Sequence, residues 1–155
     1  MAKRMLPTIR YSYNKSGNGI DINLNLNLSR FDRQYQKAQF ALDSMVMTSM
    51  VPYMPMISAN FINVTKAMSA SVAGSGLVYA AAPPMGRFLY EGKVMVDPLT
   101  GSPWARPGAK KIVTNKSLNY STSAHPRATD HWFDVAKKNH GASWIRAVKK
   151  IAGGG

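Results

Sequence analysis

The amino-acid sequence predicts an α+β fold, and three patterns carry the prediction. Residues 20–28 alternate between apolar and polar residues, as in a half-buried strand. Residues 30–50 repeat apolar residues at steps of four and three, as on one face of a helix. A loop-rich stretch then separates these elements from a helical C-terminal segment. The length of 155 residues is that of one domain, and we expect residues 1–155 to form one.

An N-terminal β-hairpin is predicted over residues 9–28, after a loose basic tail over residues 1–8. Residues 9–13 alternate weakly, and residues 15–19 contain the turn signal Asn-Gly. In the second run every other residue from Ile20 to Leu28 is apolar, and Asp or Asn stands between them. A strand with one apolar face needs a cover, from its own domain or from a neighbouring subunit.

A long amphipathic helix is predicted over residues 30–50. One face of it carries Phe31, Tyr35, Ala38, Leu42 and Met45. Ser29, with Asp32 three residues later, resembles a capping box at its start. Pro52 and Pro55 are expected to end it.

Residues 57–91 are predicted as mixed strands with ambiguous parts. The apolar spacing over 57–68 suits a short helix, and the small residues at 69–73 suit a strand. Residues 74–76 form a turn, 77–80 a short strand, and 88–90 a strand or a helix.

The stretch over residues 92–127, called the arm below, has the most loop-like composition. It carries six cations and one acid: Lys93, Arg106, Lys110, Lys111, Lys116 and Arg127 against Asp97. A loop of this length in a small domain is uncommon and usually functional. We expect an extended segment that reaches a partner, with an ordinary surface loop as the alternative.

The chain is predicted to end in helices over residues 129–151. Thr129 or Asp130 can cap the first helix. The sequence Asn139-His140-Gly141 predicts a stop, followed by a second short helix from Ala142 to Ile151.

Charge and composition restrict the function. Twenty Lys and Arg against seven acids give a net charge of +13, which favours an anionic partner, either nucleic acid or an acidic protein surface. The alternative is that the charge only aids solubility. The absence of cysteine excludes thiolate zinc sites, iron–sulfur clusters and a cysteine nucleophile. Residues 1–7 lack the apolar run of a signal peptide, and no run is long enough to span a bilayer, so we expect no membrane partner.

No catalytic or metal-binding pattern stands out. A metal site from Asp130, His131 and Asp134 can be drawn, but the aromatic residues between them favour an ordinary amphipathic helix. There is no Gly-x-Ser-x-Gly elbow, and Glu91 is the only glutamate. We therefore predict that the chain is not an enzyme and uses no cofactor or metal.

Three strings in the second half of the chain are more specific than any short motif. They are Arg87–Ala105 (RFLYEGKVMVDPLTGSPWA), Lys110–Thr114 (KKIVT) and Trp132–Lys137 (WFDVAK). In this order they resemble the minor capsid proteins of tailed bacteriophages, in the group that joins head to tail and completes the tail. The resemblance runs from about Phe31 to Lys150, and the chain departs from the family at residues 83–87 and 56–59.

The resemblance implies a small α+β subunit in which a helix packs on a small antiparallel sheet, with a projecting loop and a C-terminal helix. It implies a ring in the phage neck, between the portal (connector) of the DNA-filled head and the tail tube. The group favours six copies, with twelve as the next choice. The protein would be made in the cytoplasm of the bacterial host and reside in the virion.

Two sets of contact residues are expected on this basis. Subunit or ring contacts would come from the arm: Lys93, Asp97, Trp104, Arg106, Lys110, Lys111 and Lys116. Contacts to packaged DNA or an acidic partner would come from Lys3, Arg4, Arg10, Lys15 and Arg127. Two alternatives stay open: a free-standing basic protein that binds nucleic acid, and a capsid stopper or tail terminator at another level of the neck.

Overall fold

A computed structural model describes residues 9–14, 21–26 and 29–153, with side chains from Arg30 onward. Its elements are, in order, β1 (Ile9–Asn14), β2 (Asp21–Leu26), α1 (Ser29–Met50), the 3₁₀ turn η1 (Val51–Tyr53), α2 (Asn60–Ser71), α3 (Gly86–Glu91), β3 (Lys93–Val96), β4 (Ile112–Ser117) and α4 (Trp132–Ile151). The α+β class is confirmed. The predicted basic tail and the turn over 15–19 lie outside the described residues.

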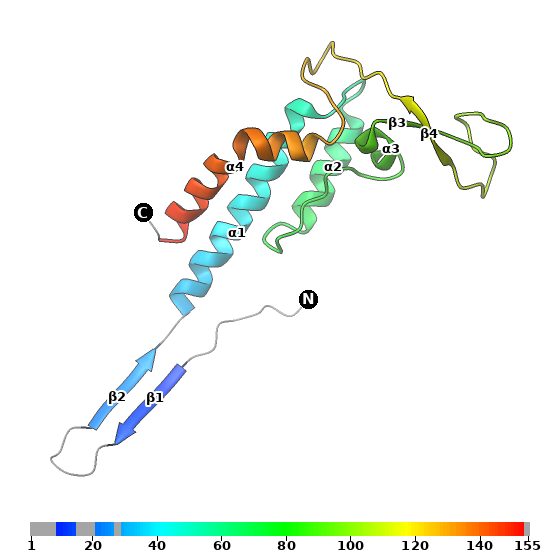
Figure 1. Cartoon of the computed structure of the whole chain (residues 1–155). Helices are drawn as coiled ribbons and strands as arrows, with labels where there is room; N and C mark the ends of the chain where they lie inside the picture. Colours follow the sequence, from blue (N-terminus) through cyan, green and yellow to red (C-terminus); the bar gives the residue numbers. More distant parts are fainter. Residues whose placement is uncertain (1–8, 15–20, 27–28, 154–155) are drawn as a thin grey trace.

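The predicted hairpin is present as the antiparallel pair β1–β2, drawn beyond the N-terminal end of α1 in Figure 1. Its register pairs Ile9 with Leu26, Tyr11 with Leu24 and Tyr13 with Ile22, while polar residues occupy the other three pairs. Directly paired residues lie on the same face of an antiparallel sheet. The alternation therefore gives the hairpin one apolar and one polar face.

The core is built around two long antiparallel helices, α1 and α4 (Figure 1). The indole Nε1 of Trp144 in α4 donates to Ser49 Oγ in α1 at 3.1 Å. One turn earlier in α4, the Asn139 side chain donates to the Tyr53 hydroxyl at 3.0 Å, just past the end of α1. The buried residues between and beside the helices are Val46, Met47, Met50, Tyr53, Met54, Phe61, Ile62, Ala82, Trp132, Ala136 and Trp144.

The partner of α1 in this core is α4, which corrects the expected packing of α1 on a sheet. The second sheet, β3–β4, lies next to α3 and away from α1 (Figure 1). The apolar face predicted for α1 is buried at Ala38 and half-buried at Leu42 and Met45. Phe31 and Tyr35 near its start are exposed.

The predicted break at Asn139-His140-Gly141 is wrong, because α4 continues through these residues to Ile151. Tyr53 holds this turn of the helix: its hydroxyl accepts from Asn139 and lies 3.4 Å from the His140 ring nitrogen. Neither Thr129 nor Asp130 caps α4. The N-cap position is His131, which has a left-handed backbone (φ 42°) and makes no side-chain cap.

The helix expected within 57–68 is confirmed as α2, which continues into the stretch 69–73 that was expected to be a strand. Residues 88–90, expected to be a strand or a helix, lie in the helix α3, and residues 77–80 are irregular and not a strand. The segment after α2 is bonded to side chains of α2 instead of to a strand. Ser69 Oγ accepts from the Tyr79 amide at 3.0 Å and donates to its carbonyl at 3.1 Å. Thr65 Oγ1, fully buried, accepts from the Ala82 amide at 3.1 Å. These bonds satisfy the backbone polar groups that a sheet would otherwise pair.

The arm contains secondary structure, which corrects its prediction as one long loop. Strands β3 and β4 pair antiparallel within it, with Met95 opposite Val113 and an irregularity between Lys93 and Met95. Gly92, with φ 65°, turns the chain from α3 into β3, and a Cβ there would lie 2.8 Å from Asp130 Cβ. Glycine is thus required at this reversal.

Candidate interaction site in the arm

The connection between β3 and β4 is organised around the carboxylate of Asp97, whose side chain is fully buried. Oδ1 accepts from the backbone amides of Leu99 at 2.8 Å and Thr100 at 3.3 Å. Oδ2 accepts from the amide of Arg106 at 3.1 Å and from its guanidinium Nε at 2.9 Å. Arg106 Nη2 completes a two-pronged ion pair with Oδ1 at 3.2 Å. The five bonds close the chain between Asp97 and Arg106 into a compact turn.

The charge state of Asp97 follows from these bonds. The Arg106 side chain, then the Arg106 amide and the Leu99 amide, hold the pKa of Asp97 far below its usual value. The carboxylate is therefore ionised at neutral pH. Because it is buried and bonded to its own chain, Asp97 shapes the arm and does not present a free carboxylate to a partner.

The Asp97 turn holds two large apolar side chains in solvent. Leu99 is 76% exposed and Trp104 is 85% exposed. Bulky apolar groups on a turn fixed by an ion pair lose little conformational freedom when a partner covers them. This is the property of an interface anchor.

A cleft of about 770 Å³ lies between α3 and the β3–β4 hairpin. Its apolar lining is formed by Met85, Phe88, Val94, Met95, Trp104 and Leu118, together with two prolines. Arg87, Lys110 and Lys111 line it as well, and none of the described residues that line it is acidic. The Lys111 ammonium lies 5.8 Å from the centre of the Phe88 ring, in a cation–π contact.

The cleft brings together three of the predicted arm residues, Trp104, Lys110 and Lys111. The other cations of the arm lie elsewhere. Arg106 forms the ion pair with Asp97. Lys93 pairs with Ser117 in the β3–β4 sheet, and Lys116 is the residue before Ser117 in β4. Arg87 and Phe88 of α3 were missed as site residues by sequence reasoning. Both residues lie in the string 87–105, so the resemblance of that string to the minor capsid proteins was the one sequence feature that could have marked them as site residues.

The residues expected to meet DNA or an acidic partner are not gathered in one place. Arg127 lies over the ring of Tyr53, 5.1 Å from its centre, at the junction of η1 and α4. Arg10 pairs with Asn25 in the hairpin. Lys3, Arg4 and Lys15 lie outside the described residues.

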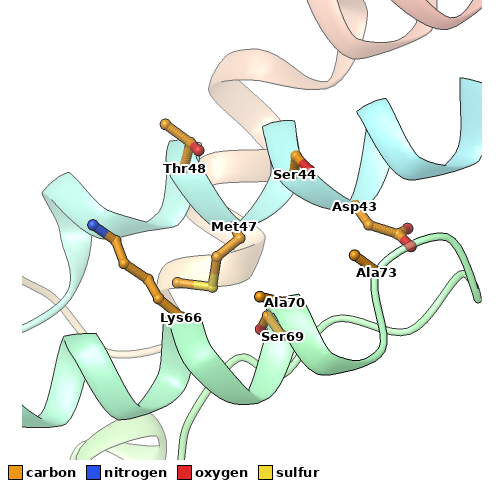
Figure 2. A pocket seen from close by; sticks show the side chains of 8 residues that line it. All are labelled: Asp43, Ser44, Met47, Thr48, Lys66, Ser69, Ala70 and Ala73. Atoms are coloured by element: carbon orange, nitrogen blue, oxygen red, sulfur yellow. The ribbon is translucent and has the colours of Figure 1, made fainter. Parts of the chain in front are cut away.

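A second, smaller pocket of about 190 Å³ lies between α1 and α2, with Asp43 and Lys66 toward its opposite ends (Figure 2). Asp43 Oδ2 accepts from the amides of Gly74 at 2.7 Å and Gly76 at 3.2 Å. Oδ1 accepts from the Gln39 amide group at 2.7 Å. This carboxylate therefore fixes the predicted turn at 74–76 against α1.

The three residues considered for a metal lie near the start of α4. His131 lies 3.8 Å from a carboxylate oxygen of Asp130 and 3.7 Å from one of Glu91. Within the part of the chain that the structure describes, no group of three His, Cys, Asp or Glu is arranged to hold a metal ion. Nor is any helix among the described residues long and apolar enough to cross a membrane.

Comparisons with known proteins identify no relative. No family model, no curated protein and no solved structure matches the chain.

Proposed function

We propose that the chain is a structural virion protein that forms a ring in the neck of a tailed phage and joins the portal to the tail tube. One observation carries the proposal. The longest of the strings that resemble the minor capsid proteins, residues 87–105, is also the segment that forms α3, β3 and most of the Asp97 turn. The specific part of the sequence thus coincides with the part of the fold that presents exposed anchors.

The proposed mechanism is assembly through repeated contacts of the arm. Leu99 and Trp104 would contact an adjacent subunit or the next ring, while the cations of the arm would meet acidic surfaces of the portal or tail proteins. In a ring each contact is heterologous and recurs at every subunit, so a modest contact is multiplied around the axis. A ring of six copies is proposed, with twelve as the next choice.

Native mass spectrometry and negative-stain imaging of the chain with its neighbouring portal and tail proteins test the proposal. We expect closed rings, or binding confined to the portal or tail end of a particle. The copy number then follows from the mass. A persistent monomer that ignores both partners would contradict the neck function.

Charge reversal in the arm gives a second test. In the triple variant Lys110→Glu, Lys111→Glu and Lys116→Glu, we expect heads and tails to remain unjoined, because the arm would repel the acidic surfaces it meets. The control is Lys137→Glu, Lys138→Glu and Lys149→Glu, which makes the same charge change on exposed positions of α4. Unchanged yields of joined particles with the arm variant would refute the role of the arm.

A free-standing nucleic-acid-binding protein is the second candidate, favoured by the net charge of +13. Binding of this kind weakens steeply with salt, because Lys and Arg release counterions from phosphates. Titration of duplex DNA at several salt concentrations distinguishes the two functions. A steep slope from a monomer that ignores the portal and tail proteins would favour this candidate.

A further inference from the structure

The cleft between α3 and the β3–β4 hairpin combines an apolar lining with positively charged side chains. Phe88, Val94, Met95 and Leu118 give it an apolar lining, and these four side chains are only partly buried by the chain itself. Trp104 stands at its edge, 85% exposed. A volume of about 770 Å³ is within the range of binding pockets and can take one or two large side chains.

The charged residues that line the cleft all have one sign. Arg87, Lys110 and Lys111 are exposed residues, and no described salt bridge involves any of them. Lys111 is already held over the Phe88 ring. Three cations beside an apolar cleft are complementary to a segment that carries carboxylates next to large apolar side chains.

A second copy of the chain fits this description poorly. The seven acids of the sequence are scattered, and the nearest two, Asp130 and Asp134, are four residues apart. Asp32, Asp43 and Asp97 are buried in the fold. The segment 130–134 places two carboxylates beside Trp132 and Phe133, but Trp132 is fully buried in the core and cannot enter the cleft of another copy. The complementary segment therefore belongs to another protein.

We propose that this cleft binds an acidic segment of a different protein, with one or two large apolar side chains in the cleft and carboxylates against Arg87, Lys110 and Lys111. The identification of that protein as a neighbour in the virion rests on the proposed neck function. The recognition of an acidic segment with large apolar side chains rests on the residues of the cleft alone. Arg87 can hold a carboxylate with two parallel hydrogen bonds, while the two lysines act as point charges.

The probe is a fluorescein-labelled peptide in which glutamates alternate with phenylalanine and leucine. It is titrated with the full-length chain at low salt and read by fluorescence anisotropy. One control peptide replaces glutamate by glutamine, and another replaces the phenylalanine and leucine by alanine. We expect saturable binding of the first peptide and weaker binding of both controls, because cleft and cations each contribute.

Matched variants assign the binding to the cleft. Lys110→Glu with Lys111→Glu should weaken binding by about tenfold or more, because both charges face the peptide. Lys137→Glu with Lys138→Glu makes the same change in net charge on α4 and should weaken binding by about threefold or less. Trp104→Ala, at an exposed position, should weaken binding without changing the circular dichroism of the chain.

Four results would overturn the proposal. The first is that the alanine control peptide binds as tightly as the glutamate peptide, and the second is that the two lysine-pair variants lose the same affinity for the peptide. The third is that duplex DNA displaces the peptide by binding more tightly at physiological salt. The fourth is that the chain self-associates and that Lys110→Glu with Lys111→Glu abolishes this association. The last would assign the cleft to a second copy. Because the titration contains no phage particles, peptide binding and the neck function can fail independently.

Discussion

Replacing each of the three tryptophans by phenylalanine should destabilise the chain in a graded order. Trp132 is fully buried, and its indole Nε1 donates to the Ala80 carbonyl at 2.8 Å. Its ring packs edge-on against Tyr90 and Phe61, with centroids 4.9 and 6.1 Å away. In Trp132→Phe the carbonyl loses its donor, at a cost of about 1–2 kcal/mol. The smaller ring leaves a cavity that costs roughly 1–2 kcal/mol more.

The total of about 3 kcal/mol should lower the Tm by about 9 °C in a chain of this size. Trp144→Phe should cost about half as much, because Trp144 is 7% exposed and the Ser49 oxygen that loses the indole N–H can accept from water instead. Trp104→Phe should stay within about 0.5 kcal/mol, because Trp104 is 85% exposed.

The assay is urea unfolding followed by far-ultraviolet circular dichroism, with the free energy extrapolated to zero denaturant. Circular dichroism is preferred because each variant changes the tryptophan fluorescence itself. If Trp104→Phe destabilised the chain as much as Trp132→Phe, the assignment of Trp132 to the core and Trp104 to the surface would be refuted.

Two further predictions concern single hydrogen-bonding groups. In Asp97→Ala the amides of Leu99, Thr100 and Arg106 lose their acceptor, so their hydrogen exchange should accelerate by about tenfold or more, and unchanged protection would contradict the Asp97 turn. Burial, and then Asp130, raises the pKa of Tyr120 to about 12. The neutral phenol is thus favoured in the fold, and its stabilisation is lost as the pH rises from about 10 to 12. Tyr120→Phe should flatten the alkaline fall in stability, and an equally steep fall in both would refute the assignment.

The parts of the fold that sequence predicts well are those with local causes. Helix α1 has a regular apolar spacing and a proline just past its end, and it spans Ser29–Met50. The β1–β2 hairpin has a turn signal between alternating runs. Helix α4 was predicted as two helices because Asn139-His140-Gly141 has the composition of a stop. The contacts of this turn with Tyr53, far away in the sequence, keep it helical, and tertiary contacts often override local propensity in this way.

The site was predicted only in part for the same reason. Trp104, Lys110 and Lys111 were named from the composition of the arm. Arg87 and Phe88 belong to α3, and they meet these residues only because β3 and β4 pair across a connection of fifteen residues (97–111). Such a connection carries no short hairpin signal. Its order depends on the ion pair between the buried Asp97 and the exposed Arg106, two residues that the sequence pattern had indicated only as contacts to a partner.

The positive surface of the chain is larger than its composition suggests, because much of its acidic charge lies inside. Asp43 and Asp97 are buried and bonded to backbone amides, and Asp32 is buried and bonded to Gln36. The other acids between residues 30 and 153 are exposed, namely Glu91, Asp130 and Asp134. Glu91 and Asp130 lie beside the start of α4, and Asp134 lies in its first turn. None of the described residues that line the cleft is acidic, so the cleft itself supplies no carboxylate to Lys110 and Lys111. Glu91, four residues after Arg87 in α3, lines a neighbouring pocket together with Arg87. An acidic segment bound there should lose only part of its affinity in salt, because salt screens the cations but leaves the apolar contacts in place. A partner held by phosphate contacts alone would be released almost completely.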